Sequence, residues 1–325
     1  MVLKIGMFIP RGVGDPRTFG PPSHKSILRY GQMADEMGFD SLWVPDHFFI
    51  ERPKGVLTPY PEAWTTMTAL AMVTKRAQIG SMVLAAGFRH PALLAKMAAA
   101  LQELSDGRLI LGVGTGNMQI EHETFGLGFE NRVGRFDEYL QILTALLNNE
   151  HITLQGKHYQ VNDARLLMTV PKVPIWIAAS GVRMLRLAAR YAAGWNGGAA
   201  MMPAGEPLVT KLAGLRAACR KIGRDPDELE ISSFTLAIVS PDAGAAAQVV
   251  ESLRDINGGI STEEIHARYV LGTPDQVIAG LRQQVAWGIN HLIVSHGSQP
   301  SCLWSDDTLT LFAREVLPAL RGATA

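Results

Sequence analysis

The sequence has few cysteines and no excess of charge of either sign. Only two cysteines occur among 325 residues, Cys219 and Cys302, and they form no CxxC pair. Reduced thiols are therefore expected, with a single disulfide as the alternative. Lys plus Arg and Asp plus Glu both number 30, so the net charge is zero. No basic surface field is available to attract a phosphate backbone, which argues against nucleic acid as a partner.

Long hydrophobic runs and several catalytic motifs are also missing. No apolar run reaches the roughly 18 residues of a membrane span, and residues 1–10 lack the basic lead and cleavage site of a signal peptide. G-x-S-x-G, the P-loop and cysteine-nucleophile motifs are absent, which disfavours hydrolases and kinases. Glu121-His122-Glu123 has no partner ligand at helical spacing, so no metal is expected. These absences favour a cytoplasmic protein that acts on a small molecule, with no membrane span.

The sequence does contain a regular alternation of apolar strands and amphipathic helices. Hydrophobic residues make up 47% of the chain, and runs such as LILGVG and HLIVS are continuous, as in strands covered on both faces. The predicted strands are 4–10, 41–47, 78–86, 108–114, 175–180, 195–200, 229–240 and 291–296. The predicted helices are 25–37, 62–75, 91–104, 133–149, 183–193, 206–222, 243–255, 273–287 and 306–320.

Eight strands with helices between them favour an α/β fold of the (β/α)8 TIM-barrel type. An open, doubly wound sheet is the competing architecture. Residues 151–161 break the rhythm and predict an inserted hairpin, and residues 257–269 form a second insertion. No low-complexity linker is present, so residues 1–325 are expected to form a single domain.

Reactive groups in such a barrel belong at the carboxyl ends of the strands. Asp46 and His47 end the second strand, where an imidazole could exchange a proton with a ligand. The alternative is a histidine satisfied by a nearby backbone carbonyl. Gly112-Val113-Gly114-Thr115-Gly116-Asn117 ends the fourth strand and superficially resembles a dinucleotide-binding turn. Three βα units precede it and no helix opens from it, so the glycines favour close passage beneath a planar ring.

Two later strand ends predict an anion site. Ala179, Ser180 and Gly181 end the fifth strand and lead into a helix, whose amino terminus presents backbone N–H groups beside a serine hydroxyl. A cofactor phosphate would suit that position, and an ordinary serine helix cap is the alternative. The glycine-rich end of the sixth strand, with Gly198, provides a second close approach of the backbone.

An ordered set of segments, spread from Ile5 to Leu320, resembles the luciferase-like monooxygenase superfamily. The segments are SLWVPDHFF (41–49), IGSMVLAAGFRHPALLAKMAAALQELSDGRLILGVGTGN (79–117), RFDEYLQILTALL (135–147), VPIWIAASGVRMLRLAARYAAGW (173–195) and GTPDQVIAGLRQQVAWGINHLIVSHGS (272–298). Within the superfamily, GVGTG and WGINHL are similar to the F420-dependent glucose-6-phosphate dehydrogenases. RMLRLAARYA is similar to the phthiodiolone ketoreductase group.

The resemblance implies a luciferase-like barrel with inserted segments that binds coenzyme F420, or FMN as the alternative. It implies hydride transfer at C5 of the deazaflavin and a cis peptide at Met82–Val83 that presses against the ring. His47 would be the active-site imidazole. The residues expected to bind the cofactor, including a phosphate at Ser180 and Gly181, are Asp46, His47, Met82, Val83, Gly114, Thr115, Gly116, Asn117, Ala179, Ser180, Gly181 and Gly198.

One position departs from the dehydrogenase pattern. Those enzymes carry a glutamate directly after GVGTG, where this chain has Asn117, and an amide cannot shuttle a proton. The downstream acid, Glu121, is retained. The catalytic candidates are therefore His47, Asn117 and Glu121.

The expected function is an F420-dependent oxidoreductase that acts on a carbonyl, alcohol or activated alkene. Asn117 argues against glucose-6-phosphate oxidation by the mechanism of the dehydrogenases. An FMN-dependent monooxygenase and a non-catalytic cofactor-binding protein are the alternatives. The loops after the first, second and eighth strands (11–23, 48–61 and 297–306) are expected to line the substrate side. A homodimer is the expected assembly.

Overall fold

The centre of the protein is a closed ring of eight parallel strands. The computed structural model describes residues 2–10, 23–52, 55–168, 171–198, 208–296 and 305–322. Strands pair in the order β1–β2–β5–β7–β10–β11–β12–β14, and β14 pairs with β1 to close the ring. The bounds are β1 Lys4–Phe8, β2 Ser41–Val44, β5 Gln78–Ser81, β7 Leu109–Gly114, β10 Ile175–Ala178, β11 Gly194–Asn196, β12 Glu230–Val239 and β14 His291–Ser295. The predicted (β/α)8 barrel is confirmed.

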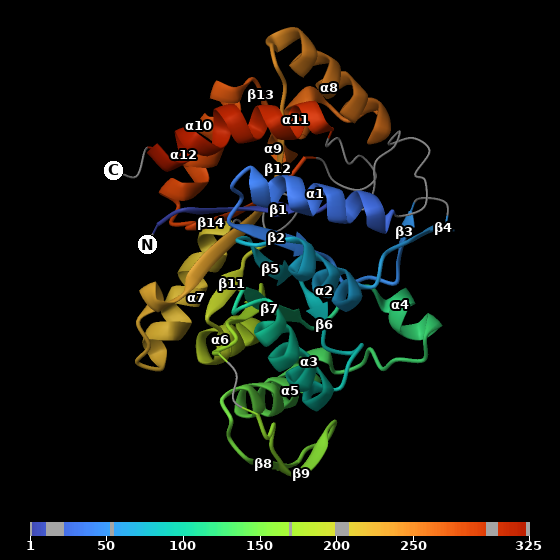
Figure 1. Ribbon diagram of the computed structural model, residues 1–325, viewed down its shortest axis with the longest axis vertical. Coiled ribbons are helices and arrows are strands. Elements are labelled where there is room, and N and C mark those ends of the chain that lie inside the picture. Colours follow the sequence, from blue (N-terminus) through green and yellow to red (C-terminus); the bar gives the residue numbers. More distant parts are fainter. Residues whose placement is uncertain are drawn as a thin grey trace.

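Helices surround the ring (Figure 1). They are α1 His24–Glu36, α2 Ala63–Val73, α3 Pro91–Leu104, α4 Gln119–Thr124, α5 Arg132–Leu147, α6 Val182–Tyr191, α7 Leu208–Lys221, α8 Ala243–Ile256, α9 Thr262–Arg268, α10 Pro274–Ala286, α11 Asp306–Leu311 and α12 Leu317–Gly322. A 3-10 turn (Pro226–Glu228) precedes β12, and a π-helical turn (Phe312–Val316) joins α11 to α12. In the described part of the chain, no helix is both long and apolar enough to span a membrane.

The insertions lie outside the ring. The predicted hairpin is present as β8 (Ile152–Gln155) and β9 (Gln160–Ala164), at the lower end of the molecule in Figure 1. The second insertion forms α9, followed by β13 (Val270–Gly272), which pairs with β12. A further hairpin, β3 (Phe49–Arg52) with β4 (Val56–Pro59), was not predicted, because four-residue strands are too short to show a clear period. A short strand β6 (Leu84–Ala85) pairs with the end of β7.

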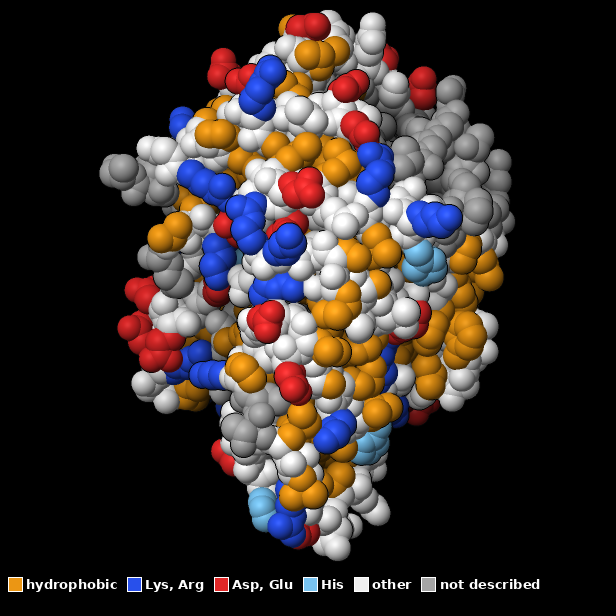
Figure 2. Space-filling model, viewed as in Figure 1, with side chains coloured by type: hydrophobic (Ala, Val, Ile, Leu, Met, Phe, Trp, Pro, Cys, Tyr) orange, Lys and Arg blue, Asp and Glu red, His pale blue; other side chains and the backbone are white. Residues whose placement is uncertain are grey.

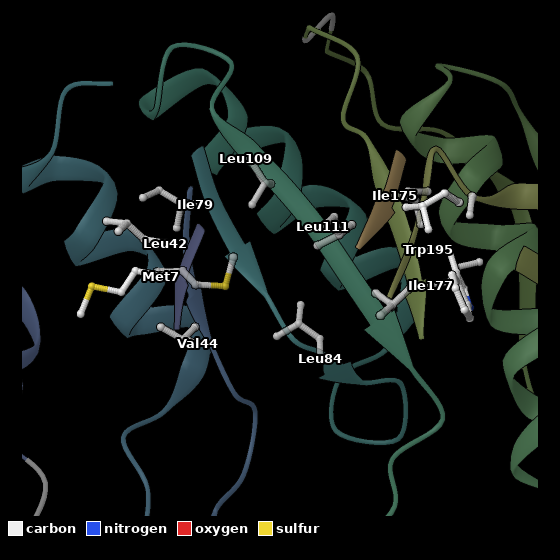
Figure 3. Close-up of a cluster of buried hydrophobic side chains, with 14 of the residues drawn as sticks. Met7, Leu42, Val44, Ile79, Leu84, Leu109, Leu111, Ile175, Ile177 and Trp195 are labelled. Carbon is white, nitrogen blue, oxygen red and sulfur yellow. The ribbon is translucent and has the colours of Figure 1, made fainter. Parts of the chain in front are cut away.

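Strand residues alternate between two hydrophobic layers. One set faces the helices and includes Leu42, Leu111 and Ile177 (Figure 3). The alternate set fills the barrel and consists of Trp43, Ile110, Trp176 and Ile293. Trp43 and Trp176 lie with ring centroids 5.1 Å apart. The barrel centre is therefore packed with side chains, as expected for this fold, and any ligand must bind at its mouth.

Glycines make room for these two indoles. A Cβ atom on Gly80 would lie 2.5 Å from Trp43, and one on Gly194 would lie 2.4 Å from Trp176. Both distances are shorter than van der Waals contact, so the strands can approach the indoles only without a side chain at these positions. The packing of the indoles therefore accounts for the glycines in β5 and β11.

A buried hydrogen-bond chain lies at the opposite, amino-terminal end of the barrel. His291 Nε2 is 2.6 Å from Ser41 Oγ, and Nδ1 is 2.7 Å from Glu230 Oε1, which also pairs with Lys4. Trp43 Nε1 donates to Ser41 Oγ over 2.7 Å. The order Ser–His–Glu is that of a hydrolase triad, but Ser41 and His291 have no exposed surface. The chain therefore joins strands β2, β12 and β14 and has no access to a substrate.

Acidification is expected to lower the free energy of unfolding as the pH falls below about 6.5. Burial lowers the pKa of His291 from its ordinary value, with Lys4 acting in the same direction and Glu230 opposing it. Burial also lowers the pKa of His122. Because both folded-state pKa values lie below the unfolded one, the unfolded chain binds protons more readily. The stability that these neutral imidazoles contribute is complete above the unfolded pKa and is lost as the pH falls through it.

Urea denaturation between about pH 7.5 and about pH 5.5 measures this loss. The His291→Gln variant cannot titrate at this position, so its stability should fall less steeply over the same interval. An equally steep fall in that variant would show that His291 does not contribute to the pH dependence.

Candidate functional site

A cavity of about 390 Å³ lies at the carboxyl ends of the barrel strands. The predicted site residues come from segments that are far apart in the sequence, and all of them except Gly181 line this cavity. Gly181 directly follows the lining residue Ser180. The wall consists of Asp46, His47, Met82, Val83, Ala85, Phe88, Gly114, Thr115, Gly116, Asn117, Glu121, His122, Ala178, Ala179, Ser180, Met184, Asn196, Gly197, Gly198 and Lys211.

His47 is held in the cavity wall by Glu121. His47 Nδ1 lies 2.8 Å from Glu121 Oε2, and the other carboxylate oxygen accepts the backbone N–H groups of Phe48 and Phe49 over 2.6 and 3.3 Å. Glu121 is only 1% exposed, so α4 carries a buried carboxylate whose oxygens are all engaged. The partner of His47 is thus a carboxylate rather than the backbone carbonyl of the alternative interpretation. With Nδ1 engaged, Nε2 is the ring nitrogen left to exchange a proton with a ligand.

Asp46 is fixed from the other side. Arg89 donates from Nη1 to Asp46 Oδ2 over 2.7 Å and from Nη2 to Oδ1 over 3.1 Å, and the Ala85 N–H donates to Oδ2 over 2.9 Å. Arg89 also pairs with Glu62, the cap of α2. Burial acts to lower the pKa of the Arg89 guanidinium, but the hydrogen bonds and charges of Asp46 and Glu62 outweigh it and raise this pKa. Arg89 is therefore a permanent cation behind the cavity wall.

A cis peptide bond joins Met82 and Val83, as predicted. It lies between β5 and β6, where the third barrel strand is interrupted. The Val83 side chain lies against Gly114, at which a Cβ atom would be only 2.7 Å from Val83 Cγ2. Met82 packs below on the Trp43–Trp176 cluster. These contacts place both side chains in the cavity wall, above the packed interior of the barrel.

The wall at β10 and β11 is open and rich in backbone N–H groups. The cap residue of α6 is Gly181, and no side chain caps this helix, so Ser180 is not the helix cap of the alternative interpretation. A Cβ atom at Gly181 or Gly198 would contact nothing within 4 Å. Free space, uncapped N–H groups and an exposed serine at a helix amino terminus fit an anion such as a phosphate.

Some wall residues were not anticipated, among them Phe88, His122, Asn196 and Lys211. One sequence signal could have found Lys211. Leu208, Lys211, Leu212 and Leu215 have the i, i+3, i+4, i+7 spacing of a buried helix face, and lysine is out of place on such a face. Phe88 lies in a loop, whereas His122 and Asn196 lie in α4 and β11, elements of six and three residues that are too short to show a period. The aromatic residues Phe48, Phe49 and Trp64 do not line the cavity, although Phe48 packs on Phe88 with ring centroids 4.4 Å apart.

Other expectations concern metals, cysteines and loops. The described residues contain no group of His, Cys, Asp or Glu side chains suited to a metal ion. Cys219 is buried and free, and Cys302 lies outside the described residues. The loops expected on the substrate side also fall largely outside them, at 11–22 and 297–304, whereas the loop after β2 carries the β3–β4 hairpin.

Comparison with known proteins agrees with this architecture. F420-dependent glucose-6-phosphate dehydrogenase of Amycolatopsis mediterranei is 30% identical over 331 residues, which cover 94% of this chain and 96% of that protein. The 5,10-methylenetetrahydromethanopterin reductase of Methanolobus tindarius is 24% identical over 90% of this chain and 95% of that protein.

The solved structure of an F420-dependent secondary alcohol dehydrogenase, in complex with an F420–acetone adduct, has the same fold. Its TM-score is 0.79 at 21% identity, with 98% of this chain and 99% of that chain covered. The family model described as luciferase-like monooxygenase matches residues 3–259. The barrel, the cavity at its mouth and this match over most of the chain agree, and the protein belongs to the luciferase-like monooxygenase family.

Proposed function

We propose that the protein is an F420-dependent oxidoreductase acting on a small organic substrate with a carbonyl, alcohol or activated alkene group. The observation that carries the proposal is the cavity itself, which brings the imidazole of His47, after β2, together with the uncapped amino terminus of α6, after β10. The names of the relatives, among them F420-dependent dehydrogenases, support the cofactor. When bound, F420 supplies hydride transfer at C5 of its deazaflavin ring.

The wall residues divide into two groups under this proposal. Asp46, Met82, Val83 and the segment 114–117 would contact the planar ring, because they form the wall between β2 and β7. Ala179, Ser180, Gly181 and Gly198 would hold the phosphate, because open space and backbone N–H groups meet there. The protein would thus orient the ring and hold its charged side chain at separate ends of one cavity.

His47 would exchange the proton that accompanies the redox step. Glu121 fixes the ring through Nδ1, so that Nε2 can donate or accept a proton at the cavity surface. Glu121 would act through His47, because its two oxygens are already occupied by His47, Phe48 and Phe49. Asn117 is exposed at the cavity rim, where its amide could orient a substrate oxygen by hydrogen bonding.

Cofactor choice gives the first test of this function. F420 should bind at least tenfold more tightly than FMN, a difference of about 1.4 kcal/mol. Fluorescence titration of the purified protein with each cofactor measures both dissociation constants. Equal or reversed affinities would favour the alternative of an FMN-dependent monooxygenase, the activity for which the family is named. Tight F420 binding without reduction of any of a panel of carbonyl compounds would favour a non-catalytic cofactor-binding protein.

We also infer a single-domain, cytoplasmic homodimer. The eight strands of the one barrel are spread along the chain from β1 to β14, which supports a single domain. Exposed apolar side chains support self-association: Met72 on α2 and Leu93 and Leu104 on α3 are each about half exposed. Figure 2 shows hydrophobic side chains gathered over the region where Figure 1 draws these helices. Sedimentation equilibrium is expected to give a dimer mass, and a monomer mass would contradict this assembly.

A further inference from the structure

Lys211 is a buried cation in the cavity wall. It lies in the first turn of α7, only 7% exposed, on the same helix face as the buried Leu212 and Leu215. Among the described residues, none forms an ion pair or hydrogen bond with it. Its ammonium nitrogen is not among the buried atoms without a partner, so the covered side chain leaves this group open to the cavity. A cation held there without an acceptor is suited to pair with an anion that binds in the cavity.

The neighbouring wall offers polar groups of the same kind. Asn196, 4% exposed at the end of β11, binds Ser232 through Oδ1 over 2.6 Å, and its Nδ2 has no hydrogen-bond partner in the described structure. Ser180 and the uncapped amino terminus of α6 line the same region. Lysine, amide and backbone N–H groups thus converge on one part of the cavity, with no described carboxylate among them.

The charges at the other end of the cavity are already balanced. Asp46 pairs with Arg89, and Glu121 pairs with His47 and two backbone N–H groups. These residues belong to β2 and its surroundings, whereas Lys211 follows β11, and β2 and β11 lie on opposite sides of the eight-strand ring. The cavity therefore suits an elongated ligand with an uncharged planar end towards β2 and an anionic end towards β11.

We propose that Lys211 neutralises an anionic group on the side chain of the bound cofactor and thereby makes tight binding depend on that group. This inference rests on the proposed F420-dependent function and names the residue that recognises the anionic half of F420. Two anions of F420 have the required chemistry, the phosphodiester and the carboxylates of the glutamate tail. The riboflavin-level deazaflavin, which lacks the phosphate and everything beyond it, has neither.

The test compares two ligands across three proteins. Lys211→Met keeps the length of the side chain and removes its charge, and it should weaken F420 binding about 10- to 100-fold, in line with loss of a charge-assisted hydrogen bond. Its affinity for the phosphate-free deazaflavin should stay within about twofold of wild type. Lys221→Met, at the exposed end of the same helix, is the matched control and should bind both ligands like wild type.

A second readout separates recognition from a structural role. Because Lys211→Met removes a cation that has no acceptor among the described residues, it should leave the melting temperature of the apo form no lower than that of wild type while weakening F420 binding. F420 without its glutamates identifies the anion. An undiminished effect of Lys211→Met with this ligand assigns the phosphodiester, and loss of the effect assigns the glutamate carboxylates.

The outcomes that overturn the inference are distinct from failure of the proposed function. Unchanged F420 affinity in Lys211→Met, or equal weakening of F420 and the phosphate-free deazaflavin, refutes the role of Lys211 while leaving an F420-dependent enzyme in place. Failure of the wild-type protein to bind F420 refutes the proposed function itself.

Discussion

Replacing His47 with alanine is expected to lower kcat about 100-fold or more, the usual contribution of a positioned acid or base. The imidazole is held by Glu121 with one nitrogen left for the ligand, so its loss removes the proposed proton donor without emptying the core. The measurement is steady-state turnover with a carbonyl substrate found by screening. The dissociation constant for F420 should change little, because the anion site lies across the cavity.

His158→Ala is the matched control for this prediction. His158 is also half-buried and hydrogen-bonded, to Asn131, but it lies on the inserted hairpin, away from the cavity wall. This variant should retain the wild-type kcat. Wild-type turnover by His47→Ala would assign His47 a structural role, and the search for the proton donor would move to other wall residues.

Replacing Arg89 with methionine is expected to destabilise the protein by about 3–5 kcal/mol, the usual cost of breaking a buried ion pair. Arg89 is the partner of Asp46, a residue that is only 6% exposed, and it also pairs with Glu62. Without the guanidinium, two carboxylates remain close together with one of them buried. Urea denaturation measures the free energy of unfolding of the variant and of wild type.

Two further variants isolate the cause. Asp46→Asn combined with Arg89→Met removes the buried charge and should recover part of the lost stability. Arg314→Met breaks the exposed pair with Glu315 and should cost less than about 1 kcal/mol. A loss in Arg89→Met no larger than that in Arg314→Met would show that Asp46 does not need its partner.

The sequence was sufficient to predict the barrel because the evidence for it is local. Strands covered on both faces must be continuously apolar, and LILGVG or HLIVS show this without knowledge of their neighbours. The residues at the mouth of the barrel can then be predicted from the direction of the strands. Asp46, His47, Thr115 and Ser180 all follow carboxyl ends of parallel strands, so they lie at the same end of the barrel. The cis peptide at Met82–Val83 came from family resemblance, since nothing in those two residue types requires it.

The pairings within the site could not be predicted, because they join residues from unrelated segments. Glu121 lies 74 residues from His47, and Arg89 lies 43 residues from Asp46. No local pattern in α4, or in the loop before α3, reports which strand end each side chain will meet. Lys211 could be predicted in part. The sequence places it on an apolar helix face, but only the folded protein shows that this residue borders the cavity.

The indole pair inside the barrel gives the protein an internal optical reporter. Trp43 and Trp176 lie directly beneath Met82, so they are separated from the cavity by one side chain. A conjugated ring bound in the cavity would lie within the short range over which a chromophore quenches indole emission. Cofactor binding should therefore quench tryptophan emission. Association and release could then be followed in real time, without attaching a dye to the protein.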